Sequence, residues 1–243
     1  MWNNKTVSVV IPAHTEEETV RTIIEKVYGC VPVDEVLVVN NASTDRTGEE
    51  VKKTRAKLTF EGRKGYGFAV QKGFREAMGD LVVLFDADGN FPAKDILKLL
   101  AYADDFDLVK GTRSRRELIE KGVYPPFISW LVMTANIAVA KFQQFVFRGP
   151  ALTDNCSLRL IKKSALKKIL PQISVGGPCF LTDMTDLAML ANLSIIEIPV
   201  RFTKRIGGRS KYSTFGLMKV AVKMVLHIMK QRVLGWFGHY KFD

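Results

Sequence analysis

Short apolar runs alternate with amphipathic segments through the first half of the chain. The apolar runs predict strands within residues 7–12, 34–40, 80–88 and 106–112, and the amphipathic segments predict helices within 16–29, 45–54, 68–79 and 95–105. Continuous apolar runs are typical of strands that are buried on both faces of a sheet. Regular alternation of strands and helices indicates a mostly parallel sheet wrapped by helices. The pattern therefore predicts an α/β fold of Rossmann-like architecture.

Each predicted strand is followed by small or polar residues. These strand ends fall at residues 14–16, 40–43, 86–88 and 111–113. Ligands of open parallel sheets bind beyond the carboxyl ends of the strands, so we expect the four ends to line one crevice. No G-x-G-x-x-G follows the first strand, and no G-x-x-x-x-G-K-[ST] occurs in the sequence. Dinucleotide-dependent oxidoreductases and P-loop NTPases therefore lose their main sequence support.

Two carboxylates, Asp86 and Asp88, follow the buried run LVVLF with only Ala87 between them. Residues two apart on a strand point to the same side, so the two carboxylates are predicted to face one site. Mg²⁺ and Mn²⁺ prefer such oxygen ligands and need few of them when a diphosphate supplies the rest. The alternative is a surface turn, because Asp, Gly and Asn favour turns. We predict a metal site here.

Residues 127–147 are apolar and long enough to be considered as a membrane span. However, Ser129, Asn136 and Gln143 recur every seven residues in one stripe of the predicted helix. A helix that packs on the protein or lies on a membrane fits this pattern better than a span does. An ordinary core helix is the alternative.

The last predicted helix, residues 214–235, carries Lys219, Lys223 and Lys230 on one narrow stripe, with His227 nearby. A mostly apolar helix with a basic stripe is typical of a helix that lies in a membrane interface. Docking on the protein's own core or a dimer interface would produce a similar pattern. We therefore divide the chain into a catalytic domain, residues 1–212, and a basic amphipathic helix and tail, residues 213–243.

The chain has 243 residues and a formal net charge of +11, which is unevenly distributed. From Arg201 onward there are ten lysines and arginines against one acid, Asp243, which together supply +9. Such asymmetry indicates an anionic partner, and the interleaved apolar residues favour a membrane surface over nucleic acid. The three cysteines are widely spaced and no signal peptide is evident, so we expect reduced thiols and a peripheral protein on the cytoplasmic face of a membrane.

Seven sequence motifs, in order, resemble the family 2 glycosyltransferases of GT-A fold, and within them the dolichyl-phosphate and polyprenyl-phosphate hexose synthases. The motifs are VSVVIPAHTEEETV, VNNASTDRT, RKGYGFAVQKGFREAMGD, DADGN, GTR, TDNCSLRLIKKSAL and IPVRFTKRIGGRSKYS. The resemblance covers about residues 6–213. It implies a GT-A catalytic domain that binds a nucleoside diphosphate sugar together with Mn²⁺ or Mg²⁺.

The resemblance also implies roles for individual residues. Those expected to bind the nucleotide sugar are Pro12, Ala13, Glu16, Asn41, Lys64, Gly65, Asp86 and Ala87, and those expected at the metal are Asp86, Asp88 and Asn90. Asn41 stands where the family usually has an aspartate that reads the base. An amide has both a donor and an acceptor where a carboxylate only accepts, so the choice between uracil and guanine stays open.

The reaction implied is transfer of a hexose with inversion, from GDP-mannose or UDP-glucose to a polyprenyl or dolichyl phosphate. Asp88, Arg113 and Asp186 are the expected catalytic residues, and those expected to bind the acceptor phosphate are Arg113, Arg159, Arg209 and Lys211. A phosphate acceptor is already an anion near neutral pH, so it needs cationic positioning rather than a general base.

Two other functions are compatible with the same motifs. A family 2 enzyme that acts on a sugar hydroxyl would need a carboxylate base, for which Asp183 and Asp186 are the candidates. A catalytically silent protein could instead bind membranes or a partner enzyme through the basic last helix. For the lipid-phosphate enzyme, a membrane-anchoring subunit is a further expected partner, and nucleic acid is not.

Overall fold

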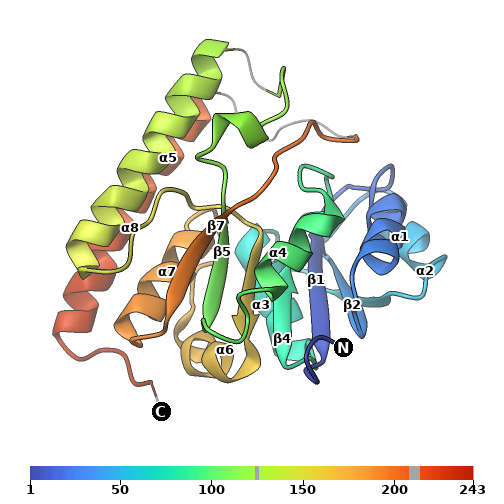
Figure 1. Cartoon of the computed structure of the whole chain (residues 1–243), viewed down its shortest axis with the longest axis horizontal. Helices are drawn as coiled ribbons and strands as arrows, with labels where there is room; N and C mark the ends of the chain where they lie inside the picture. The colour runs from blue at the N-terminus through green and yellow to red at the C-terminus, as the bar shows by residue number, and fades with distance from the viewer. Residues whose placement is uncertain (124–125, 208–213, 243) are drawn as a thin grey trace.

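A computed structural model, which describes residues 1–123, 126–207 and 214–242, shows a seven-stranded sheet flanked by helices (Figure 1). The strands follow the spatial order β3-β2-β1-β4-β6-β5-β7. Their bounds are β1 Val7–Ala13, β2 Glu35–Asn40, β3 Lys57–Phe60, β4 Leu81–Leu84, β5 Leu108–Thr112, β6 Arg159–Lys162 and β7 Ile195–Pro199. The main helices are α1 Val20–Cys30, α2 Thr47–Lys52, α3 Tyr66–Glu76, α4 Ile96–Leu100, α5 Pro126–Phe147, α6 Lys163–Ile169, α7 Phe180–Leu190 and α8 Thr214–Trp236.

Strand β6 runs antiparallel to both of its neighbours, β4 and β5, whereas the other pairings in the sheet are parallel. The start of β6 therefore lies at the same edge of the sheet as the carboxyl ends of β1, β2, β4 and β5. This places residues 153–158 beside the four predicted strand ends.

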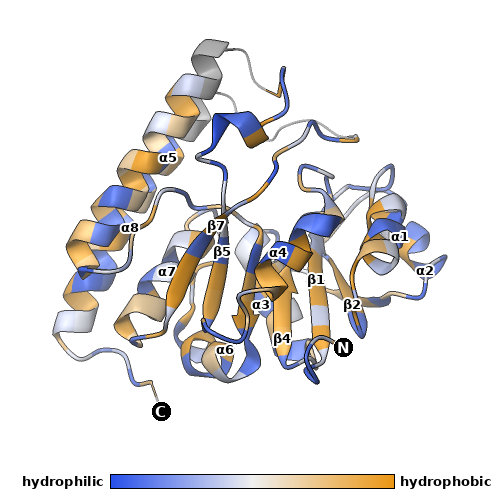
Figure 2. Ribbon diagram, viewed as in Figure 1, coloured by the Kyte–Doolittle hydropathy of each residue, from blue (hydrophilic) through white to orange (hydrophobic). Residues whose placement is uncertain are grey.

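Apolar packing on both faces of the sheet explains why the strands read as continuous apolar runs. On one face α1, α2 and α4 pack over a buried cluster that includes Val9, Ile24 and Leu99. On the other face α3, α6 and α7 pack over a second cluster that includes Val10 and Phe180. Figure 2 shows that the strands between these layers are hydrophobic along most of their length. The predicted α/β fold with helices on both faces of the sheet is confirmed.

The segment through Asp88 differs from its prediction. Strand β4 ends at Leu84, so Asp86 and Asp88 lie beyond it in a turn rather than on the strand. Gly89 makes this turn with a φ of 78°, in the left-handed region that favours glycine. The two carboxylates are therefore oriented by the turn and its neighbours and not by the pleat of the sheet.

Helices α5 and α8 lie side by side at one end of the sheet and extend past its carboxyl edge (Figure 1). Within the described residues, no helix combines the length and apolarity that a membrane span requires. Lys219, Lys223 and Lys230 are exposed along α8, whereas His227 is turned inward and its Nε2 lies 2.8 Å from Asp183 Oδ1. The last helix is thus packed onto the domain that precedes it.

Candidate active site

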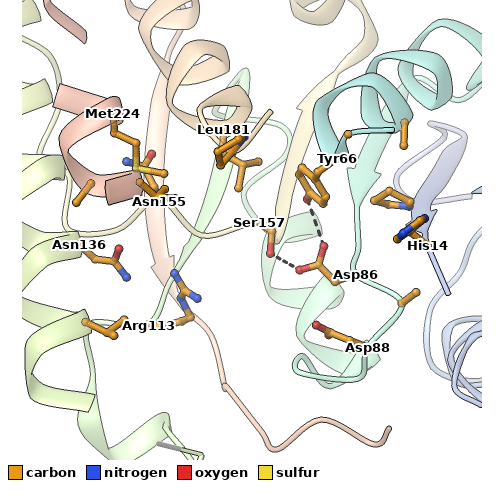
Figure 3. A pocket seen from close by; sticks show the side chains of 18 of the residues that line it. His14, Tyr66, Asp86, Asp88, Arg113, Asn136, Asn155, Ser157, Leu181 and Met224 are labelled. Carbon is orange, nitrogen blue, oxygen red and sulfur yellow. Dashed lines mark hydrogen bonds between the residues drawn. The ribbon is translucent and has the colours of Figure 1, made fainter. Parts of the chain in front are cut away.

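A cavity of about 720 Å³ lies between the carboxyl edge of the sheet and helices α5, α7 and α8 (Figure 3). One part of its wall comes from the strand ends and the turns that follow them. The lining residues there include Pro12, Ala13, His14, Glu16, Asn41, Lys64, Gly65, Tyr66, Asp86, Ala87, Asp88, Arg113, Asn155, Ser157 and Arg205. The opposite part is largely apolar and includes Leu131, Val132, Ala135, Val139, Leu181, Val220, Ala221 and Met224.

The carboxylate of Asp86 is held from two sides (Figure 3). Its Oδ1 accepts a hydrogen bond of 3.2 Å from the Tyr66 hydroxyl, and its Oδ2 accepts one from the Ser157 hydroxyl. Burial raises the pKa of Asp86 to about 6, the negative charge of Asp88 adds to this rise, and the two hydrogen bonds oppose it. Two buried carboxylates that repel each other in this way would both be stabilised by a cation between them.

Asp88 already has a cationic partner from the segment that follows β7. Its Oδ2 lies 2.8 Å from an Arg205 guanidinium nitrogen, and Asn90 donates to both carboxylate oxygens, at 3.0 Å from its backbone and 2.8 Å from its amide. The backbone N–H of Ile206 donates to the Asp88 carbonyl at 3.1 Å. Arg205 belongs to a motif that the resemblance includes, but sequence reasoning gave it no role.

The donor set at this turn fits a divalent cation. Asp88 and Asp86 both line the cavity and provide hard carboxylate oxygens. The described residues contain no cluster of three or more His, Cys, Asp or Glu side chains suited to a metal. Two carboxylates are sufficient when substrate oxygens complete the coordination shell, as for Mg²⁺ or Mn²⁺ that carry phosphates.

Asn41 is part of the predicted nucleotide site, but its side-chain amide is hydrogen-bonded to other residues of the protein. Its Nδ2 donates to the carbonyls of Glu61 and Arg63, at 3.2 and 2.7 Å, and its Oδ1 accepts from the Gly65 N–H at 2.9 Å. The amide therefore fixes the loop that carries Lys64 into the cavity. Its recognition of a base stays a prediction.

Gly65 is required by a close approach of backbone to backbone. Its φ is 151°, and a Cβ at this position would lie 2.4 Å from the carbonyl oxygen of Gly176. The same neighbour accepts a hydrogen bond from the Gly67 N–H at 3.0 Å. Gly65 and Gly67 let the loop pack against residues 175–176. Glycine at these positions is therefore explained by the packing of the loop as well as by the predicted approach of a phosphate.

Arg113 lines the cavity from the end of β5 and is clamped by Asp154. Its Nε and a terminal nitrogen each lie 2.8 Å from an Asp154 oxygen, and its backbone N–H donates to the same carboxylate at 2.9 Å. Burial would raise the pKa of Asp154, but the Arg113 guanidinium more than offsets this and holds the pKa below its usual range. Arg113 is thus a rigidly placed positive charge beside the cavity.

Arg159 does not occupy the position predicted for it. Its side chain is 1% exposed and is not part of the cavity wall. Its Nε donates to the Cys156 carbonyl at 2.9 Å, and a terminal nitrogen donates to the Leu181 carbonyl at 2.8 Å. In this structure the guanidinium joins the start of β6 to α7 instead of lining the cavity, and direct binding of an acceptor phosphate by Arg159 stays a prediction.

Asp186 is also absent from the cavity wall, and its catalytic role stays a prediction. It is fully buried on α7, and its Oδ1 accepts a hydrogen bond of 2.7 Å from the Gln143 amide of α5. Asp183, one turn earlier, is bonded to His227 and Gln231 of α8. The two acids connect α7 to the long helices. Arg209 and Lys211 fall outside the described residues.

Replacing Asp186 with asparagine is expected to leave the rate of transfer within about twofold of the wild type. Burial raises the pKa of this carboxyl well above its usual range, which favours its neutral form, and an amide is a close substitute for a neutral carboxyl. Wild-type stability should fall as pH rises above about 4, because the unfolded chain releases a proton that the folded chain retains. Denaturation at pH 5 and pH 8 should show less of this pH dependence in Asp186→Asn. A loss of about 10²-fold in kcat would instead identify a general base.

The geometry defines a class of protein: an α/β protein with a cavity and paired carboxylates at the carboxyl edge of its sheet, where open α/β sheets bind their ligands. The sequence profile of "Glycosyl transferase family 2" matches residues 8–170. The chain belongs to this family and is therefore a glycosyltransferase that uses a nucleotide sugar.

Relatives and solved structures agree with this assignment. Uncharacterised glycosyltransferases of Mycobacterium tuberculosis and Mycobacterium bovis are 30% identical to the chain over 227 residues, which cover 92% of the chain and 96% of each relative. Glucosyl-3-phosphoglycerate synthase from M. tuberculosis, in complex with Mn²⁺, UDP and glucosyl-3-phosphoglycerate, aligns with a TM-score of 0.68 at 20% identity. That alignment covers 94% of this chain and 80% of the synthase, and at this identity it shows the shared fold.

Proposed function

We propose that this enzyme transfers a hexose from a nucleoside diphosphate sugar, UDP-glucose or GDP-mannose, to a polyprenyl phosphate. The observation that carries the proposal is the apolar wall that α5 and α8 place opposite the carboxylates of the cavity. Its side chains include Leu131, Val132 and Met224. A wall of this kind suits the hydrocarbon of a lipid, because burial of apolar surface favours binding. It does not suit a small, highly charged acceptor.

The position of the carboxylates supports a phosphate acceptor. Among the described residues that line the cavity, the carboxylates are Glu16, Asp86 and Asp88, and they all follow β1 or β4. The acids that sequence reasoning offered as a base for a hydroxyl acceptor, Asp183 and Asp186, are buried behind the cavity. An acceptor phosphate needs no base, and Arg113 is the cation placed to orient it.

Asp88, assisted by Asp86 and Asn90, would hold Mn²⁺ or Mg²⁺. The bound ion would neutralise the charge that develops on the departing diphosphate. Around it, Tyr66 and Ser157 fix the Asp86 carboxylate, and Arg205 adds a second positive charge beside Asp88. Solved structures of glucosyl-3-phosphoglycerate synthase contain Mn²⁺ with UDP, which supports Mn²⁺ as the first ion to test.

A hydroxyl acceptor is the second candidate. One of the solved structures with this fold holds Mn²⁺, UDP-glucose and phosphoglyceric acid together. The assay that separates the two supplies labelled UDP-hexoses and GDP-hexoses with Mn²⁺ or Mg²⁺, and either polyprenyl phosphate or 3-phosphoglycerate. Label that enters the organic phase only with polyprenyl phosphate supports our proposal. Label on water-soluble phosphoglycerate, or no lipid labelling while nucleotide is released, contradicts it.

We also propose that α8 binds an anionic phospholipid surface on the cytoplasmic face of a membrane. Its exposed apolar side chains are spaced three or four residues apart and form one stripe. They are Val222, Leu226, Met229, Val233 and Trp236. The exposed lysines Lys223 and Lys230 border this stripe on the helix surface. An apolar stripe with a basic border matches the chemistry of an anionic bilayer interface, and the same helix forms the cavity wall that would receive the lipid.

The double variant Leu226→Gln and Trp236→Gln is expected to lose most of its sedimentation with phosphatidylglycerol vesicles. These side chains are 65% and 83% exposed, so their replacement should leave the fold intact. Deletion of the whole helix would be less informative, because α8 lines the cavity and bonds to Asp183. Met78→Gln is the matched control, since Met78 is 71% exposed but follows α3. Equal sedimentation of the double variant and the wild type would exclude α8 as the membrane-binding surface.

A further inference from the structure

Asn155 lines the cavity with an amide that has no partner in the described part of the chain. The residue is only 8% exposed, and neither its Nδ2 nor its Oδ1 makes a hydrogen bond there. Buried polar side-chain atoms are bonded in the large majority of cases, and an unmade bond costs about 1–3 kcal/mol. An amide left in this state on a cavity wall points to a partner that enters the cavity.

The neighbours of Asn155 fix its position. Asp154 is clamped by Arg113, the Cys156 carbonyl accepts a bond from Arg159, and the Ser157 hydroxyl donates to Asp86. This short stretch before β6 is therefore bonded to β5, β6 and the turn after β4, while the Asn155 side chain is left unbonded. Such rigid support is what a recognition residue requires, because the orientation of its amide is set before the ligand arrives.

The chemistry of the amide identifies the kind of group that it would bind. Asn155 presents a donor and an acceptor side by side. A phosphate dianion only accepts, so it would satisfy Nδ2 and leave Oδ1 unpaired beside negative charge. A hydroxyl both donates and accepts, and neighbouring hydroxyls on a sugar ring can satisfy both atoms of the amide. The donor and acceptor pair therefore matches a sugar better than it matches a phosphate.

The location of Asn155 agrees with this chemistry. In the view of Figure 3, Asn155 lies toward the side of the cavity that α5 and α8 line, with Ser157 and Asp86 between it and His14. His14 and Asp88 lie with the residues expected at the nucleotide and its diphosphate, and Met224 belongs to the apolar wall. A hexose attached to the diphosphate and directed toward the acceptor would occupy the space between them.

We propose that Asn155 binds hydroxyl groups of the hexose being transferred and so helps to determine which sugar the enzyme accepts. The inference rests on the nucleotide-sugar donor of the proposed function, but it does not depend on the acceptor. It assigns to this chain a sugar-recognition residue that is separate from the carboxylates and cations of the diphosphate site.

The test compares ligands that differ only by the hexose. Dissociation constants are measured by calorimetry, with Mn²⁺ and without acceptor, for UDP, UDP-glucose, GDP and GDP-mannose. For the nucleotide that the wild type binds, Asn155→Ala should leave the affinity for the diphosphate within about twofold. It should weaken the matching sugar nucleotide about tenfold, the size of one lost hydrogen bond. Asn155→Asp, which keeps the shape but removes the donor, should also weaken the sugar nucleotide selectively.

Thermal unfolding without ligand provides an independent readout. Since Asn155→Ala removes two buried unbonded atoms, its melting temperature should equal or exceed that of the wild type. A clear drop would indicate a structural role and overturn the inference, as would equal weakening of both ligands or no change in either. If Asn155→Ala weakens sugar binding selectively but no lipid is labelled, only the proposal of a polyprenyl phosphate acceptor is contradicted. If the wild type binds no sugar nucleotide, the proposed function and the role of Asn155 are both contradicted.

Discussion

Asp88→Ala is expected to lower kcat for hexosyl transfer by about 10³-fold while leaving the protein folded. The Asp88 carboxylate has several polar partners in the site: Asn90 donates to both of its oxygens, and Arg205 pairs with it at 2.8 Å. Its loss removes the expected ligand of the metal and leaves Arg205 without this partner. The rate should be measured with saturating donor, and Mn²⁺ binding should be measured separately by calorimetry in the presence of UDP or GDP.

Asp104→Ala is the matched control for this experiment. Asp104 is also an aspartate, but it pairs with Lys5 at 2.6 Å and is half exposed, at the opposite edge of the sheet. Removing it changes the net charge by the same amount and should leave the rate unchanged. If Asp88→Ala keeps more than a tenth of the wild-type rate, or binds Mn²⁺ as tightly, the assignment of Asp88 to the metal is wrong.

Arg159→Met is expected to lower the free energy of unfolding by about 3 kcal/mol, because hydrogen bonds to a charged group contribute about 1.5–3 kcal/mol each. The Arg159 guanidinium bonds to the Cys156 and Leu181 carbonyls and, at 3.2 Å, to the Thr185 hydroxyl. Burial lowers its pKa to about 10, so it stays charged at neutral pH. Part of the gain from these bonds is offset by desolvation of the charge, which keeps the expected loss below their sum. Urea denaturation monitored by circular dichroism measures the change.

Lys162→Met on the same strand is the control. Lys162 makes an ion pair of 3.5 Å with Asp107 and donates a hydrogen bond of 3.1 Å to the Asp104 carbonyl, both near the surface, and should contribute less than about 1 kcal/mol. A direct role in acceptor binding would give a different result for Arg159→Met: unchanged stability and a raised KM for polyprenyl phosphate. Arg159→Lys keeps the charge but not the planar set of donors, so an intermediate stability would support the structural role.

Much of the nucleotide side of the site could be predicted from local sequence. Parallel strands must bring their carboxyl ends to one edge, so identifying the strands that end near Ala13, Asn40 and Thr112 was enough to predict one crevice. Glu16, Asp86 and Asp88 follow such ends and line the cavity as expected. Ser157 and Arg205 were not predicted, because they reach the site from segments whose position depends on the antiparallel insertion of β6 and on the turn at Gly89.

The charge of a residue did not by itself predict whether its side chain binds a ligand, because that also depends on whether the side chain is buried. Arg159 stands in a motif of the resemblance and Asp186 was an expected catalytic residue, but a sequence does not show whether such a side chain faces a cavity or the interior. The structure buries both, and they hold α7 to β6 and to α5. Asn155 is the opposite case: a neutral residue without a distinctive pattern that the fold places, unbonded, on the cavity wall.

The sequence by itself determined the α/β class, the position of the two carboxylates after a buried strand, and two long apolar helices with polar stripes. These features depend on periodicity and composition, which are local. Only the tertiary structure decided which polar residues face the cavity and which connect buried elements, and only it placed α5 and α8 together as the apolar wall opposite Asp86. Those properties depend on how segments distant in sequence pack, and packing is settled by the free energy of the whole fold rather than by any one segment.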